Sequence, residues 1–187
     1  MVEGSEEVWS TDWDLCDIWY ATSDDGFTWR EQGVAVARPP KPNPGWRSVT
    51  TTDILVWEGK YYLYYQAFSA PSGTRGNDKT RGDDCPVTFS SSNSPDGPWT
   101  PVGKIVVPNG AAGVWDQYSI HDPYPLVYKG RIYLYYKSDC DGDPRLVRMQ
   151  GLAIADLEPG NPASRIENRV AEPAANPYYV FAGQIAA

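Results

Sequence analysis

Short apolar and aromatic runs recur along the chain, separated by polar stretches rich in glycine and proline. Residues 54–57 (ILVW) and 60–66 (KYYLYYQ) form two such runs, and they flank Glu58-Gly59. Two β-rich runs around a two-residue turn predict a hairpin, because glycine readily adopts the positive φ that a tight turn needs. The second run is apolar or aromatic at nearly every position, which predicts a strand covered on both faces.

The same pattern occurs twice. Residues 53–66 (DILVWEGKYYLYYQ) resemble residues 122–137 (DPYPLVYKGRIYLYYK), and Gly59 lies 71 positions before Gly130. A second pair of turns, SDDGFTW around Gly26 and SPDGPW around Gly97, has the same offset of 71. Two markers with one period indicate an internal repeat.

Each period holds enough short strands for one blade of a β-propeller. After the hairpin come VTFSSS (87–92) and KIVVP (104–108), and the polar segment 70–84 lengthens the repeat as an exposed loop. Four short strands, with the middle ones buried on both faces, are typical of a propeller blade. The fold class predicted is therefore all-β, a β-propeller.

Two full blades and parts of two others are expected within a single partial propeller domain, residues 1–187. The expected parts are the outer strands of a preceding blade (1–40), two full blades (47–108 and 119–170) and the first strand of a following blade (176–187). Such an open arc has unpaired strand edges, which favour pairing into a homodimer.

Composition and charge exclude some classes of partner. The 187 residues suit one domain, and the formal net charge of −8 makes nucleic acid a poor partner. No apolar run approaches the roughly 20 residues of a membrane-spanning helix, so no membrane partner is expected. The first ten residues lack a signal-peptide pattern, which leaves the cytoplasm and a bacterial periplasm open as compartments.

Acidic residues stand at or near the start of each expected innermost strand, where a propeller opens into its central funnel. Asp53 and Asp122 are these residues, although Asp122 lies two positions earlier relative to the turn glycine. Carboxylates that converge on a funnel suit glycoside hydrolysis, in which one group donates a proton and another activates water. The alternative is that each carboxylate bonds local backbone amides. His121, the single histidine, could orient a carboxylate, bind a sugar hydroxyl or simply pack.

A metal site has a weaker signal. Asp139, Asp141 and Asp143 match the start of a calcium loop, but Gln150 stands where the loop requires a glutamate. A solvated turn is the favoured interpretation, and a divalent cation stays open only for these three residues. No cofactor is required by the rest of the sequence.

These motifs together resemble glycoside hydrolase family 117. The resemblance rests on Trp13-Asp14-Leu15, IWYATSDDGFTWREQGVAVAR, WRSVTTTDILVWEGKYYLYYQA, SNSPDGPW, HDPYPLVYKGRIYLYYK and LAIAD, in that order. It implies a five-bladed propeller related to family 43. It also implies inverting cleavage of terminal α-1,3-linked 3,6-anhydro-L-galactose from neoagaro-oligosaccharides, the products of agar degradation.

The resemblance also assigns roles to residues. The aspartate of the His-Asp-Pro motif, Asp122, matches one of three active-site acids, which tunes the proton donor and helps hold the sugar. The other matches are expected to contact substrate: Trp13, Arg47, Thr51, Asp53, Gln66 and His121.

The sequence departs from the family pattern at the other two acids. No Asp-Pro-Ser motif, which carries the general base, occurs before Trp13, and Ala174 and Ala175 align with the acid region. We therefore expect one of three catalytic acids here and poor hydrolysis of neoagarobiose by this chain. The alternative is a non-catalytic or degenerate sugar-binding propeller module.

Overall fold

The computed structural model describes residues 15–69, 85–111, 114–116, 119–138, 149–156 and 168–172, the last range as backbone only. These residues form ten β-strands and no helix, which confirms the all-β prediction. No helix within the described ranges is long and apolar enough to cross a membrane.

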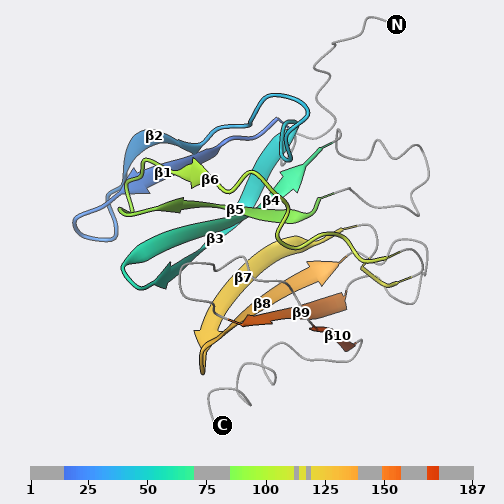
Figure 1. The fold of residues 1–187 in the computed structure, drawn as a ribbon. Coiled ribbons are helices and arrows are strands. Elements are labelled where there is room, and N and C mark those ends of the chain that lie inside the picture. The colour runs from blue at the N-terminus through green and yellow to red at the C-terminus, as the bar shows by residue number, and fades with distance from the viewer. Residues whose placement is uncertain are drawn as a thin grey trace, which may run out of the picture.

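The strands form three antiparallel sheets (Figure 1). The first sheet pairs β1 (Ile18–Thr22) with β2 (Arg30–Val36). The second has the order β3 (Ser48–Trp57), β4 (Lys60–Phe68), β5 (Val87–Ser92) and β6 (Thr100–Pro101). The third contains β7 (His121–Tyr128), β8 (Arg131–Ser138), β9 (Met149–Asp156) and β10 (Asn168–Glu172), again in chain order.

Both predicted hairpins are present, and their turns explain the repeated glycines. Glu58 and Gly59 have φ of 48° and 74°, and Lys129 and Gly130 have φ of 47° and 73°. Positive φ at both central residues defines the turn whose twist matches that of the flanking strands. The two turns therefore fix β3 to β4 and β7 to β8 in the same register.

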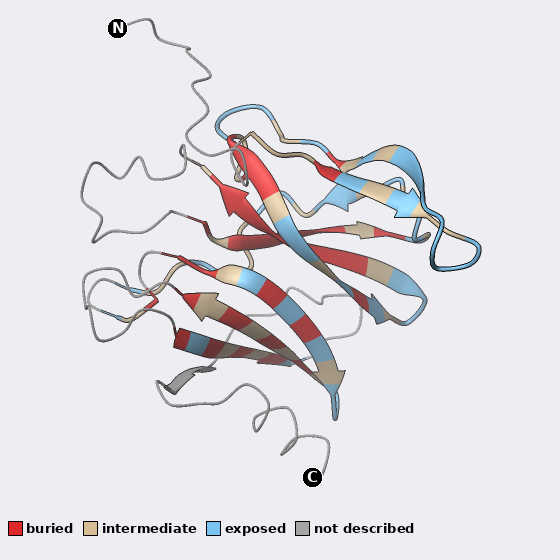
Figure 2. Cartoon of the chain, turned by 180° about the vertical axis from the view of Figure 1, so that it is seen from behind, coloured by how far each residue is buried: buried red, intermediate tan, exposed pale blue. Residues whose placement is uncertain are grey.

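The core lies between the sheets, with β4 at its centre. Seven consecutive residues of β4, Tyr62–Phe68, are buried, as the unbroken apolar pattern predicts. One face of the second sheet packs on the third sheet, and its other face packs on β1 and β2 through Val49 and Leu63. Figure 2 shows the buried stretch of β4 and the alternating burial of β8.

One predicted strand is wrong. Residues 104–108 do not form the fourth strand of the second sheet; β6 takes that place, at Thr100–Pro101. Segment 104–108 instead makes an isolated bridge through Val107 to Val87, and both backbones exchange hydrogen bonds there. The apolar pattern marked a buried segment, but burial here comes from packing against β5 rather than from a ladder.

A bulge interrupts each of the two adjacent strands β3 and β7. The register of β3 shifts at Thr51, and the register of β7 shifts between His121 and Tyr124. Thr51 and Asp122 both have positive φ, 44° and 52°. They lie 71 positions apart, the same period as the turn glycines. In this repeat, Asp122 is therefore the counterpart of Thr51 and not of Asp53.

Candidate functional site

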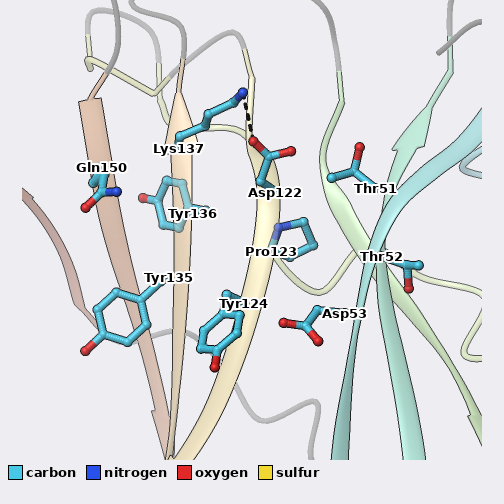
Figure 3. A pocket seen from close by; sticks show the side chains of 10 residues that line it. All are labelled: Thr51, Thr52, Asp53, Asp122, Pro123, Tyr124, Tyr135, Tyr136, Lys137 and Gln150. Carbon is cyan, nitrogen blue, oxygen red and sulfur yellow. Dashed lines mark ion pairs between the residues drawn. The ribbon is translucent and has the colours of Figure 1, made fainter. Parts of the chain in front are cut away.

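An open cavity of about 390 Å³ lies where β3 meets β7 and β8 (Figure 3). Its lining combines acids, hydroxyls, an amide and aromatic rings: Thr51, Thr52, Asp53, Asp122, Pro123, Tyr124, Tyr135, Tyr136, Lys137 and Gln150. Three of the residues predicted from the sequence, Thr51, Asp53 and Asp122, thus lie at one site.

The two bulges place the site's central side chains. A left-handed residue inside a strand turns its side chain out of the regular alternation. Thr51 and Asp122 are both exposed at their bulges, and both line the cavity. A positive φ is rare for a β-branched residue such as threonine, and such strain is concentrated at functional sites.

Asp122 forms an ion pair within the cavity. Its Oδ2 lies 2.8 Å from Nζ of Lys137, with side chains 47% and 33% exposed. Figure 3 shows the pair at one end of the cavity, with the second carboxylate oxygen directed away from the ammonium. At this exposure the pair adds little stability. A carboxylate and an ammonium together offer acceptors and donors to sugar hydroxyls.

The remaining lining provides further polar groups and aromatic surface. Asp53 Oδ1 accepts a hydrogen bond from the backbone N–H of Ile54 at 2.7 Å, and Figure 3 shows Asp53 and Tyr124 among the residues that line the cavity. Tyr124 is 47% exposed, which leaves part of its ring accessible to a ligand. Burial, with a smaller effect of Tyr133, raises the pKa of Tyr135 further above neutral pH, and its protonated hydroxyl can donate a hydrogen bond.

Behind the cavity, Gln66 and His121 bond to each other across the two sheets. Gln66 Nε2 lies 2.7 Å from His121 Nδ1, and the backbone N–H of Asp122 donates to Gln66 Oε1 at 3.4 Å. Gln66 is 2% exposed. Neither Gln66 nor His121 belongs to the cavity lining. These two predicted residues are therefore connected to the cavity indirectly, through Asp122.

The other predicted site residues are separate from this cavity or outside the described ranges. Arg47 is buried and does not line it, and its backbone N–H donates to the carbonyl of Phe68. Trp13 and the candidate metal ligands lie outside the described residues; those ligands are Asp139, Asp141 and Asp143. Within the part of the chain that is described, no three His, Cys, Asp or Glu side chains gather as a metal site would need.

Seven lining residues were not predicted as site residues: Thr52, Pro123, Tyr124, Tyr135, Tyr136, Lys137 and Gln150. The repeat could have indicated Lys137, because Lys137 lies 71 positions after Gln66 and each of the two residues ends its repeated segment. Gln66 and Lys137 thus occupy the same place in the two sheets, and both contact Asp122, one at its backbone and one at its carboxylate.

Comparisons with known proteins agree with this architecture. The family model described as glycosyl hydrolases family 43 matches residues 8–171. Zg3597, a family 117 glycoside hydrolase of the marine bacterium Zobellia galactanivorans, is 57% identical, with a TM-score of 0.76. The match covers 91% of this chain and 46% of Zg3597, so the chain spans about half the length of that relative.

More distant structures share the fold alone. An endo-arabinase of Bacteroides thetaiotaomicron is 18% identical over 83% of this chain and 47% of its own, with a TM-score of 0.59. A thermostable family 43 glycoside hydrolase is also 18% identical, over 76% of this chain and 41% of its own, with a TM-score of 0.53. No match is found among the curated proteins.

Proposed function

Because the chain belongs to the glycosyl hydrolases of family 43, with a family 117 enzyme as a relative, we propose that its cavity binds the terminal sugar of an algal galactan oligosaccharide for hydrolysis. The finer proposal is inverting cleavage of terminal α-1,3-linked 3,6-anhydro-L-galactose. The marine source of the 57% identical relative supports an algal substrate.

The observation that carries this proposal is the position of Asp122. Its carboxylate lies in the cavity at a bulge of β7, next to Lys137 and opposite Thr51 and Asp53 across the β3–β7 boundary. Acceptors, donors and an exposed tyrosine ring around one opening are the groups that bind sugar hydroxyls and sugar faces.

Asp122 is proposed to hold the sugar and to set the electrostatics around the proton donor. Glycoside hydrolysis needs a general acid and a second carboxylate that activates water or attacks. Neither of these two roles is assigned to a residue that the structure describes. Asp122, already bonded to an ammonium, suits a supporting role in which it accepts hydrogen bonds from the substrate.

We extend the proposal to the architecture. The two four-stranded sheets correspond to two blades of a five-bladed propeller, within residues 47–108 and 119–170. Residues 1–40 and 176–187 would contribute to neighbouring blades, and the open edges would support a homodimer.

A second candidate is a sugar-binding module without catalysis. The alanines at positions 174 and 175, where family 117 carries its acid region, favour this alternative. It uses the same cavity and predicts binding without release of sugar.

The experiment is calorimetric titration of the purified chain with neoagarobiose, together with an assay for released 3,6-anhydro-L-galactose. We expect binding, and about tenfold weaker binding for Asp122→Asn, because a charge-assisted hydrogen bond to the sugar is lost. Asp24→Asn is the control, since Asp24 also forms an ion pair with a cationic side chain, that of Arg30, but lies outside the cavity.

The outcomes separate the candidates. Sugar release by the chain supports the hydrolase, whereas binding without release supports the module. Absence of binding to neoagarobiose, or equal loss in Asp122→Asn and Asp24→Asn, would refute the assignment of this cavity.

A further inference from the structure

We propose that Gln66 is a positioning residue that acts across the boundary between two sheets. It holds His121 in the neutral form protonated on Nε2, and it fixes the backbone of Asp122. Gln66 belongs to β4, whereas His121 and Asp122 belong to β7 of the other four-stranded sheet.

The orientation of the Gln66 amide follows from its contact with Asp122. A backbone N–H can only donate, so the atom 3.4 Å from the nitrogen of Asp122 must be the amide oxygen. The amide nitrogen then faces His121 Nδ1 at 2.7 Å. A flipped amide would place two donors against each other at the Asp122 backbone.

This orientation fixes the tautomer of His121. An amide NH₂ group only donates, so Nδ1 must accept and carries no proton. The proton of the neutral ring therefore sits on Nε2. Protonation of Nδ1 would oppose the amide donor and would require the Gln66 side chain to release Asp122.

Burial makes the arrangement rigid. Gln66 is 2% exposed, and Cys85 is fully buried, with Sγ lying 3.6 Å from both Gln66 Nε2 and His121 Nδ1. Cys85 also accepts the backbone N–H of Ile120 at its carbonyl, directly before His121. The imidazole and the amide thus pack on a buried thiol, where water cannot replace a lost bond at low cost.

For the cavity, the consequence is that Asp122 is held by two bonds. Gln66 binds its backbone N–H and Lys137 binds its carboxylate, so both ends of the residue are held while it adopts φ of 52°. Gln66 does not line the cavity, which makes it a positioning residue rather than one that touches the sugar.

The test uses nitrogen NMR of the ¹⁵N-labelled chain. His121 is the single histidine, so the imidazole region contains one pair of nitrogens. At neutral pH and above we expect Nδ1 to resonate as an unprotonated nitrogen and Nε2 as a protonated one. A wild-type spectrum with a protonated Nδ1 would overturn the proposal without any variant.

Two variants sharpen the test. Gln66→Glu has nearly the same shape, keeps an acceptor for Asp122 and loses the donor, so Nδ1 of His121 should become protonated. Gln66→Met loses both bonds, and the Asp122 amide proton should exchange faster with solvent. An unchanged tautomer in Gln66→Glu, or unchanged Asp122 exchange in Gln66→Met, would refute the assigned role.

Thr88→Val is the matched control. Thr88 is also buried in the same sheet and donates to the carbonyl of Lys104 at 2.7 Å. Its replacement should lower stability and leave the His121 nitrogens unchanged, whereas a change there would show that any core defect moves the signal.

Sugar affinity is a separate readout, which rests on the proposed function. Gln66→Met should weaken neoagarobiose binding about fivefold, because Asp122 loses its fixed backbone. If wild type does not bind the sugar, the proposed function fails, while the tautomer still decides the role of Gln66.

Discussion

Thr51 and Asp122 occupy the same place in two adjacent sheets. Each is the left-handed residue at the bulge of the first strand of its sheet, with φ of 44° and 52°, and each lines the same cavity. Aspartate tolerates this conformation better than most residues, whereas threonine is β-branched and strained there. The left-handed conformation therefore occurs at both repeat positions, although it lowers stability at Thr51.

Thr51→Gly should leave the free energy of unfolding unchanged or raise it by up to about 2 kcal/mol. Relief of strain of about 1–3 kcal/mol outweighs the entropy cost of glycine, about 0.5–1 kcal/mol. Thr52→Gly is the control, since Thr52 also lines the cavity but has no positive φ, and it should lose about 1 kcal/mol. Urea denaturation measures both, and equal losses would contradict strain at Thr51.

Tyr136→Phe should destabilise the protein by about 1.5–3 kcal/mol. The hydroxyl of Tyr136 donates to Oδ2 of the fully buried Asp116 at 2.7 Å, and its ring stacks on Trp115. The phenylalanine keeps the stacking but withdraws a donor from a buried carboxylate. Tyr128→Phe, at the exposed end of β7, should change stability by less than about 0.5 kcal/mol. Similar losses in the two variants would show that the bond to Asp116 contributes nothing.

The Asp25 carboxylate in the turn before β2 should stay ionised at acidic pH, which keeps the hydrogen bonds of the turn. Backbone N–H groups of Thr28 and Phe27, then the hydroxyl of Ser23, stabilise the Asp25 carboxylate and lower its pKa from 3.8 to about 2. A lowered pKa in the folded turn stabilises it above the unfolded value of 3.8, and this contribution is lost as pH falls through about 2. Amide shifts of Phe27 and Thr28 should titrate with a midpoint near 2. A midpoint near 3.8 would mean that the turn does not hold the carboxylate.

Local features were predictable because they depend on neighbouring residues. The turn glycines Gly59 and Gly130 indicate hairpins since a two-residue turn needs positive φ. Successive side chains of a strand point to opposite faces, so the nearly unbroken apolar run of β4 predicts burial on both faces. Asp122 was predicted as a site residue from its place before a repeated strand and from the family resemblance, and in the structure it lines the cavity.

Features that depend on the placement of one sheet against another were not predictable. The bond of Gln66 to His121 was not predicted, because it forms only where β4 and β7 pack side by side. The ion pair of Lys137 with Asp122 was also not predicted, although Lys137 lies at the repeat position of Gln66. That pair forms within the third sheet, where Lys137 lies opposite His121 in the register of β7 and β8. The offset of 71 positions already relates Asp122 to Thr51 rather than to Asp53, but no spacing in the sequence shows that both residues lie at bulges with positive φ.

The bond between Gln66 and His121 also limits how such proteins can be recombined. A chimaera that takes β3–β6 from one parent and β7–β10 from another separates an amide from the imidazole it orients. The two sheets have the same strand order, but the contact between them depends on residues from both. A chimaera that keeps this contact must therefore take Gln66 and the His121-Asp122 pair from the same parent.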